Sequence, residues 1–438
     1  MAVLDGSVAN VALPSIAREL HADAASSIWV VNAYQVVVAM LLLPLSALGD
    51  SIGYRRVYAS GIVVFTLGSL ACALSPTLLI LIFARMLQAV GGAGIMSIAP
   101  ALLRTVFPAR MLGVAVGISA LTVASSAAAG PTIGGGILAV LPWPWLFAIN
   151  VPIGIFDSAF ALRALPNTPG SGKRVDLWST LLVAPTLALF ITGLDGFARH
   201  ASHVAIAAML AGCVAAGTAL VLRERAIPNP LIPFDLFALR RFSLAAATSS
   251  LSFVAQGIAF VALPFLFQTA NGYTPFQSGL LFTPWPIAIA VIAPIAGRLS
   301  DRYPPPVLST LGLGTFACGL ALLATLPLHA SPADIVWRAV VCGIGFGFFQ
   351  APNNRELLGS APRERSGGAA GVLATVRVTG QSIGAAIVAV ALGTLTAARV
   401  ADLAPGSAAL GAPAHEALWI GAGCALVACA VSGLRLIR

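Results

Sequence analysis

The chain opens with MAVLDGSVANVALPSIAREL (1–20), an apolar segment with one carboxylate, Asp5, near its start. An ionisable residue inside a membrane helix is costly and is therefore a functional candidate. The same apolar character continues throughout, because 58% of the 438 residues are hydrophobic, 9% are charged and the mean hydropathy is +0.95. Soluble domains carry about 25% charged residues. The sequence therefore predicts an integral membrane protein.

Fourteen apolar segments are long enough to cross a bilayer, since a helix needs about 20 mainly apolar residues to do so. The predicted spans lie near 1–19, 26–48, 57–75, 77–99, 111–140, 145–165, 177–195, 202–222, 242–269, 276–298, 306–328, 333–352, 367–394 and 415–434. No cleavable signal peptide precedes the first span, so we expect that span to be retained. The expected fold class is an all-α polytopic membrane protein.

The basic residues indicate the orientation. With a cytoplasmic N-terminus, 18 of the 24 Lys and Arg residues fall in cytoplasmic loops and at the C-terminus, against four on the opposite side. The positive-inside rule then predicts cytoplasmic N- and C-termini in a bacterial inner membrane. The same scatter in short loops argues against a nucleic-acid partner. The six cysteines lie in apolar runs without CxxC spacing, so we expect no metal and no cofactor.

Two polar connectors, 166–176 and 223–241, divide the chain into six, two and six spans. We predict an N-terminal six-helix bundle (1–166), two inserted helices with their connectors (167–241) and a C-terminal six-helix bundle (242–438). An internal repeat supports the division. LSALGDSIGYRR (45–56) and IAGRLSDRYPPP (295–306) each place a small residue, a leucine, an aspartate and a basic residue at the cytoplasmic end of the second span of their bundle. Two-half transporters with a central site have such repeats.

Four motifs carry a family resemblance, and the first is LDGSVANVALPSI (4–16). It is similar to the signature LD-x-T-x-VN-VALP-x-I, with Ser7 in place of Thr. This signature is that of the 14-helix drug:proton antiporters of the major facilitator superfamily, the QacA/EmrB type, which the chain resembles over its full length. The resemblance implies a major facilitator fold with 14 transmembrane helices, and it implies that Asp5 takes part in proton coupling or cation binding.

A role for Asp5 is physically reasonable, because burial favours a protonated carboxyl and a nearby cation favours the carboxylate. A proton and a cationic drug could thus exclude each other at one group. The alternative is an acid at the cytoplasmic interface. Thirteen residues at about 1.5 Å each place Asp5 roughly 20 Å below Arg18, inside the hydrocarbon core. On this count the first span lacks about one cytoplasmic turn, and we expect that the natural chain begins further upstream.

Three more motifs carry the resemblance. The loop after the second span is similar to G-x-L-x-D-R-x-G-R-R and predicts a charge latch that breaks when the two halves move. The alternative is that its basic residues only set the orientation in the membrane. The C-terminal copy of the motif predicts a weaker latch. The latch residues are Asp50, Gly53, Arg55, Arg56, Gly297, Asp301 and Arg302.

LIFARMLQAVGGAG (81–94) resembles R-x-x-Q-G-x-G-A, which implies that Arg85 assists proton transfer unless it is a structural arginine bonded to backbone carbonyls. SSAAAGPTIGGGIL (125–138) resembles the exporter motif G-x-x-x-GP-x-x-GG through Gly130, Pro131, Gly134 and Gly135.

Further polar and aromatic residues could line a central cavity. Asp157 lies halfway along the sixth span and is either a second proton or cation site or a structural acid. The expected cavity residues are Asn10, Gln35, Gln88, Gln256, Trp285, Gln350, Arg377 and Gln381.

These features predict a proton-coupled efflux antiporter that exports lipophilic, cationic drugs or toxic compounds by alternating access. Its partners would be protons, a small-molecule substrate and the lipid bilayer, and a periplasmic adaptor is left open. Enzyme activity is not expected, because the sequence has no nucleotide-binding loop or catalytic cluster. The alternatives are a dedicated exporter of one metabolite or antibiotic, and a proton-independent lipid flippase.

Overall fold

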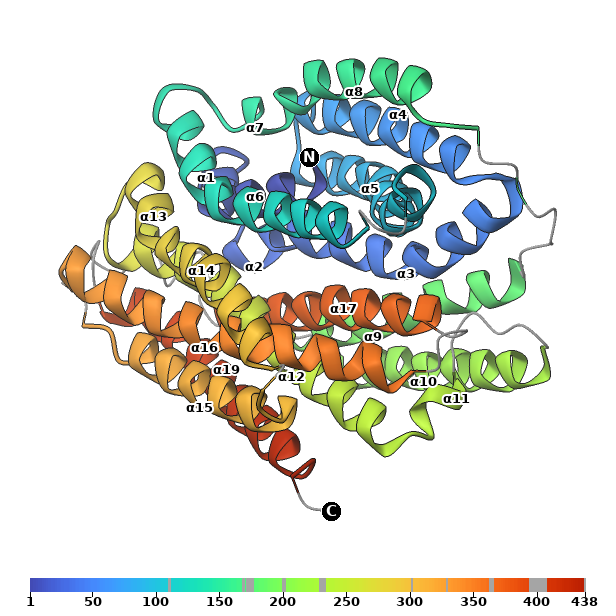
Figure 1. The fold of residues 1–438 in the computed structure, drawn as a ribbon. Coiled ribbons are helices and arrows are strands. Elements are labelled where there is room, and N and C mark those ends of the chain that lie inside the picture. The colour runs from blue at the N-terminus through green and yellow to red at the C-terminus, as the bar shows by residue number, and fades with distance from the viewer. Residues whose placement is uncertain are drawn as a thin grey trace.

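The computed structural model describes residues 1–108, 112–167, 170, 177–198, 202–227, 234–300, 302–327, 330–361, 366–393 and 408–436. Across these ranges the chain forms helices and their connections, and no β-strand (Figure 1). The described residues include eleven helices that are long and apolar enough to cross a membrane, and two shorter apolar stretches, Ala129–Val140 and Leu181–Phe190. The chain is a multi-pass all-α membrane protein, and the total of fourteen spans stays a prediction.

The upper group of helices in Figure 1 comes from the N-terminal part of the chain. Its members are α1 (Ala2–Glu19), α2 (Ala24–Ser27), α3 (Trp29–Ile52), α4 (Tyr54–Ala73), α5 (Leu78–Val106), α6 (Leu112–Val140), α7 (Trp145–Ala148) and α8 (Asn150–Ala164). Within this group α5 packs against α3 and α4, α1 against α6, and α4 against α8. Helix α5 therefore holds a central place in the group.

The lower group contains the remaining helices. They are α9 (Leu177–Ala198), α10 (His203–Ala226), α11 (Phe234–Phe237), α12 (Arg240–Phe265) with its π-helical extension η2 (Leu266–Ala270), α13 (Pro275–Phe282), α14 (Pro284–Leu299), α15 (Pro305–Ala324), α16 (Pro332–Ser360), α17 (Ser366–Leu392) and α19 (Ala408–Gly433). Helices α9 and α10 pack on each other, and α9 also contacts α3 and α17. The predicted domain boundaries remain a proposal.

Each predicted span coincides with a helix or with two consecutive helices. Several helices begin at a proline. Proline suits the first turn because an N–H at that position has no intrahelical partner, so its absence costs no hydrogen bond. Pro275, Pro305 and Pro332 open α13, α15 and α16. Thr274 and Gln277 add a reciprocal capping box to α13. The predicted span 276–298 divides at Thr283, where α13 ends before Pro284 begins α14.

The internal repeat extends to glycine contacts inside each half. Gly61 and Gly91 let α4 and α5 touch, since a Cβ on Gly91 would lie 2.2 Å from the Phe65 nitrogen. Gly312 and Gly345 do the same for α15 and α16, where a Cβ on Gly345 would lie 2.3 Å from the Phe316 nitrogen. Each pair occupies the same positions counted from its helix starts. Small residues allow such close approach of membrane helices.

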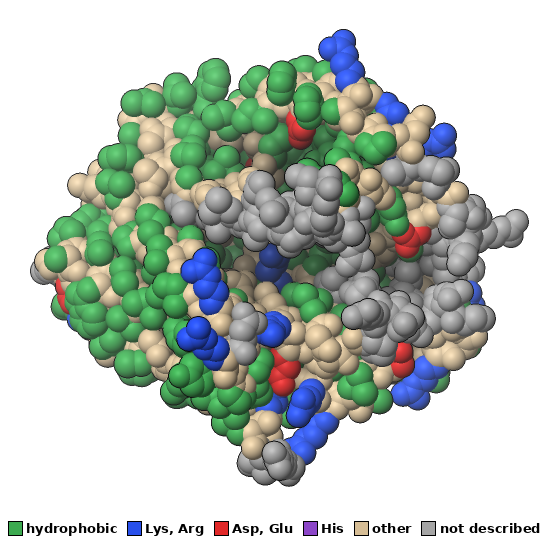
Figure 2. Space-filling model, in the orientation of Figure 1, with side chains coloured by type: hydrophobic (Ala, Val, Ile, Leu, Met, Phe, Trp, Pro, Cys, Tyr) green, Lys and Arg blue, Asp and Glu red, His purple; other side chains and the backbone are tan. Residues whose placement is uncertain are grey.

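The two groups meet along α3 with α17 and along α6 with α13 and α14. Thr132 and Thr283 place their hydroxyl oxygens 2.6 Å apart, and the Ser382 hydroxyl donates to the Asn32 side-chain oxygen at 2.6 Å. The Gln268 amide donates to the Val11 carbonyl at 2.9 Å. Figure 2 shows hydrophobic side chains over the left of the molecule, with Lys and Arg side chains mainly at the right and lower middle. The helices run roughly from one of these regions to the other.

Candidate functional site

Asp5 is buried at the centre of a charged cluster. Its carboxylate oxygen Oδ2 lies 2.5 Å from Nη1 of Arg85, and the exposed fractions of the two side chains are 1% and 0%. Oxygen Oδ1 accepts hydrogen bonds from the Gln88 amide at 3.0 Å and from the Asn150 amide at 2.9 Å. Buried ions are tolerated when paired and hydrogen-bonded in this way. Helices α1, α5 and α8 together therefore hold the carboxylate.

Arg85 is also fixed by groups from α3 and α7. Its Nε donates to the Val30 carbonyl at 3.0 Å, and its Nη1 also donates to Gln88 Oε1 at 2.5 Å. The guanidinium lies 4.4 Å from the ring centroid of Tyr34 and 5.3 Å from that of Phe147. Such cation–π contacts are strongest where water is excluded. The backbone bond expected of a structural arginine is present, and the same residue also pairs with Asp5, while its part in proton transfer stays a prediction.

Sequence reasoning did not find Asn150, Tyr34 or Ser69 as members of this cluster. Ser69 accepts a hydrogen bond from the Gln88 amide at 2.7 Å and thereby orients that side chain. The signal in the sequence was a polar residue at the start of an apolar span, as at Asn150. The structure shows that this residue is buried, with 2% of its surface exposed. Polar groups in membrane helices usually face a partner.

The predicted acid Asp157 lies elsewhere. It is half-buried and lines a cavity of about 340 Å³ between α4, α5 and α8, together with Tyr58 and Phe160. The described contacts give it no bond to Asp5 or Arg85, so the structure does not bring the three predicted proton-coupling residues together.

The expected cavity residues fall into separate groups. Gln88 belongs to the Asp5 cluster, and the Gln381 amide donates to Gln256 Oε1 at 3.0 Å, joining α17 to α12. Asn10 and Gln35 each keep a buried side-chain oxygen that has no partner among the described residues. Trp285 is fully buried and packs edge-on against Phe260 and Phe316, as part of the C-terminal core. Gln350 and Arg377 are half-buried on α16 and α17.

The glycine motif of α6 serves close packing on two sides. A Cβ on Gly130 would lie 2.4 Å from the Ser7 Cβ, and one on Gly134 would lie 3.2 Å from Val8, so this face lies against α1 next to Asp5. A Cβ on Gly135 would lie 2.6 Å from the Pro275 carbonyl oxygen, and the Pro131 carbonyl faces Gly279 of α13. The motif therefore touches both the acid-bearing helix and the other half of the molecule.

The predicted latch differs from expectation. Asp50 accepts a hydrogen bond from the Tyr54 hydroxyl at 2.5 Å, and no arginine bonds to it among the described contacts. Arg55 instead donates to Asn167 at 2.6 Å and to the Leu162 carbonyl, which ties the start of α4 to the end of α8. Gly53, with φ of 103°, turns the chain sharply between α3 and α4.

The remaining latch residues make few contacts. Arg56 and Arg302 are exposed, and Gly297 faces open space. Asp301 lies outside the described residues. Within the C-terminal half, a different ion pair joins α16 to the end of α19. The sequence motifs did not indicate it.

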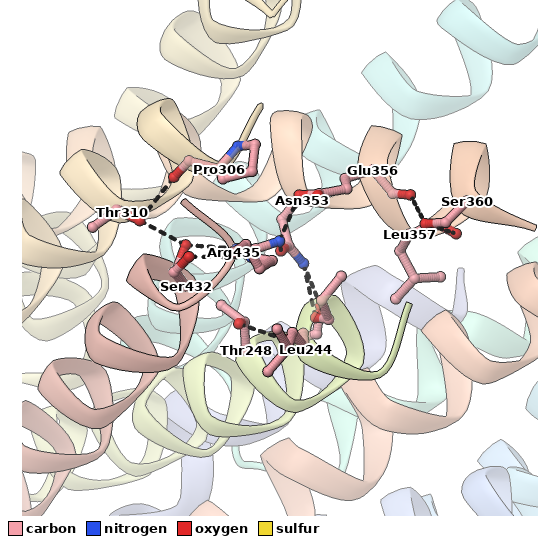
Figure 3. A network of polar contacts seen from close by, with 12 residues as sticks. Leu244, Thr248, Pro306, Thr310, Asn353, Glu356, Leu357, Ser360, Ser432 and Arg435 are labelled. Carbon is pink, nitrogen blue, oxygen red and sulfur yellow. Dashed lines mark hydrogen bonds and ion pairs between the residues drawn. The ribbon is translucent and has the colours of Figure 1, made fainter. Parts of the chain in front are cut away.

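That ion pair is Arg435 with Glu356, at 2.7 Å (Figure 3). Arg435 also donates to Asn353 Oδ1 at 2.8 Å and to the Ser432 hydroxyl at 2.6 Å. Thr310 on α15 donates to the same Ser432 hydroxyl at 2.8 Å. The network connects α15, α16 and α19 at one end of the C-terminal half, and Asn353 extends it to α12 through Ser249.

A model of the Major Facilitator Superfamily matches residues 1–385. The chain belongs to this superfamily. It is accordingly a membrane transporter and not an enzyme.

Curated relatives within the superfamily differ in what their names record. The uncharacterized transporter YebQ of Escherichia coli (strain K12) is 49% identical over 442 residues, which covers 100% of this chain and 93% of YebQ. The riboflavin transporter RibZ of Clostridioides difficile (strain 630) is 31% identical, with 88% and 84% of the two chains covered. The multidrug resistance protein Stp of Mycobacterium tuberculosis is 32% identical, with 91% and 74% covered.

A solved structure supports the same fold. A bacterial homologue of the human lysosomal transporter Spinster superposes with a TM-score of 0.70 at 14% sequence identity, covering 99% of this superfamily member and 93% of that chain. At this identity the likeness concerns the fold alone.

Proposed function

We propose that the protein is a proton-coupled efflux antiporter of the 14-helix type, which exports lipophilic compounds across the bacterial inner membrane by alternating access. The observation that carries this proposal is the buried cluster of Asp5, Arg85, Gln88 and Asn150. A carboxylate in a membrane helix is a functional candidate, and a proton on it would remove the charge that pairs with Arg85. We further propose that both termini lie in the cytoplasm, which the distribution of basic residues supports.

The cluster is placed to influence the contact between the halves. Asp5 lies one turn from Val8, which packs on the α6 glycine motif, and Val11 further along α1 accepts the hydrogen bond from Gln268 of the C-terminal half. A proton on Asp5 neutralises its side of the ion pair and weakens the hold of α5 on α1. Such a change in α1 would alter its packing on α6, α12 and α13 together. This is how proton uptake would favour one arrangement of the two halves.

Export direction rests on the α6 motif and on the relatives. The contacts between α6 and α13 join the two groups of helices, and under the predicted topology these contacts lie toward the outside. Stp, which is named as a multidrug resistance protein, supports a broad range of exported compounds. A single dedicated metabolite is the second candidate, and RibZ, named as a riboflavin transporter, favours it.

The coupling role can be tested in everted membrane vesicles with a panel of ethidium, fluorescein and riboflavin as probes. Wild-type protein should accumulate at least one probe when the lumen is acidified. Asp5→Asn should abolish this pH-driven accumulation while retaining probe exchange at equal pH. Full pH-driven accumulation by Asp5→Asn would overturn the coupling role. Transport of riboflavin alone would favour the dedicated exporter.

A further inference from the structure

Arg377 lies near the middle of α17, on the same stripe as Gln381 one turn away. Two neighbouring faces of this helix are occupied: Gly380 and Gly384 pack against α12, and Ser382 bonds to Asn32 of α3. The Gln381 side chain bonds to Gln256 of α12. Arg377 therefore shares a helix stripe with Gln381, one of two amides that are paired between α12 and α17.

Arg377 differs from Arg85 and Arg435 in having no partner among the described residues. Arg85 pairs with Asp5, and Arg435 pairs with Glu356. For Arg377, no hydrogen bond, ion pair or ring contact is found with any part of the chain that the structure describes, and its side chain is half-buried. Arginine does not lose its proton in proteins. A charged group in a membrane helix without a protein partner marks a water-filled path or a ligand.

Two acids that could attract a cation are already bonded to arginines. Both oxygens of Asp5 are bonded, and Glu356 is bonded to Arg435. Asp157 lies in the separate cavity between α4, α5 and α8. On the stripe of α17 that carries Gln381, the charge without a described partner is thus positive, at Arg377. This distribution argues against the cationic preference that the helix 1 motif suggested.

We propose that the transported compounds are lipophilic anions or zwitterions, whose carboxylate, sulfonate or phenolate group binds Arg377. The guanidinium presents a planar fork of donors that matches a carboxylate or sulfonate in two parallel hydrogen bonds. Gln381, one turn along the same stripe, and its partner Gln256 can bond to further polar groups of the substrate. The aromatic side chains Phe253 and Phe346, whose ring centroids are 5.6 Å apart, are buried in the apolar core on α12 and α16.

This inference shares one assumption with the proposed function, namely that the protein binds a small-molecule substrate. Its test is a binding measurement and needs no proton gradient. Fluorescein and rhodamine 123 share a xanthene body, but the first is anionic and the second cationic. Fluorescence polarisation with the purified full chain in nanodiscs should give tighter binding of fluorescein. Arg377→Gln should weaken it about tenfold or more, the loss expected for one charge-assisted hydrogen bond pair. Arg377→Lys should retain part of the affinity.

The matched control is Arg225→Gln, which removes an exposed arginine at the end of α10 and should leave fluorescein binding unchanged. If Arg377→Gln does not fold, Gln381→Leu provides the second variant and should weaken fluorescein binding a few-fold. Tighter binding of rhodamine 123 than of fluorescein, or equal fluorescein affinity in Arg377→Gln, would overturn the proposal. Displacement of fluorescein by phosphatidylglycerol in the nanodiscs would also overturn it, because the bound anion would then be a lipid. None of these outcomes bears on the role of Asp5 in coupling.

Discussion

Asp5 and Arg85 lie 80 residues apart in sequence and 2.5 Å apart in the structure, with almost no exposure of either side chain. Neither charge could remain at this depth alone, because an isolated ion loses its hydration without compensation. The ion pair therefore allows Asp5 to be buried as a carboxylate. The same pair opposes protonation of Asp5, because the arginine favours the charged carboxylate. Transport would require a state in which this obstacle is reduced.

Arg85→Gln should destabilise the protein by about 3–5 kcal/mol, because it leaves the Asp5 carboxylate buried without its cation. The double variant Asp5→Asn/Arg85→Gln should recover much of this loss, since two neutral amides can bond to each other. Thermal unfolding of both variants in detergent checks the prediction. Equal destabilisation by the single and the double variant would show that packing, and not charge, governs the site.

Tyr34 offers a separate test of the ring beneath Arg85. Its hydroxyl has no hydrogen-bond partner among the described residues, while its ring centroid is 4.4 Å from the guanidinium. Tyr34→Phe should therefore change stability by no more than about 0.5 kcal/mol. Tyr34→Ala should cost about 3–5 kcal/mol through the lost ring and the cavity that remains. A large loss in Tyr34→Phe would mean that the hydroxyl, and not the ring, is the important group.

Gly279→Val should open the contact between α6 and α13. Any Cβ at this position would lie 2.2 Å from the Pro131 carbonyl oxygen, and backbone cannot give way by that much. Cysteines at Thr132 and Thr283, whose hydroxyl oxygens are 2.6 Å apart, report this contact through disulfide formation. Cross-linking should be efficient in the otherwise native chain, unchanged by the control Gly423→Ala and strongly reduced by Gly279→Val. Unreduced cross-linking with Gly279→Val would refute the contact.

Arg435→Gln should loosen the end of the C-terminal half. The substitution leaves Glu356 without its cation and removes the donors to Asn353 and Ser432, so we expect a loss of about 3 kcal/mol. Hydrogen exchange should rise at the ends of α16 and α19 and stay unchanged in α4 and α5. A uniform rise over the whole chain would instead indicate that the two halves unfold together.

The helices could be predicted well from the sequence alone. In a bilayer each spanning segment must satisfy its own backbone hydrogen bonds, so apolar length and proline position nearly determine a helix. The span predicted at 306–328 corresponds to α15, and the one at 77–99 to α5. The helix count, orientation and domain boundaries remain predictions.

The candidate site was only partly accessible in this way. Asp5, Arg85 and Gln88 stood out because polar residues in apolar spans are rare, whereas their mutual contact depends on how α1 and α5 are rotated and cross. The same holds for Asn150, which is 145 residues from Asp5 in sequence, and for Tyr34. Asp157 is equally conspicuous in sequence, yet α8 directs it to another cavity.

The sequence by itself thus determined that the chain is helical, lies in a membrane and contains buried charges, because lipid imposes those rules on each segment separately. Only the tertiary structure decided which charges neutralise each other. It paired Asp5 with Arg85 and Arg435 with Glu356, and it left Arg377 without a described partner. Such pairing depends on the packing angles between helices distant in sequence, and no local pattern encodes those angles.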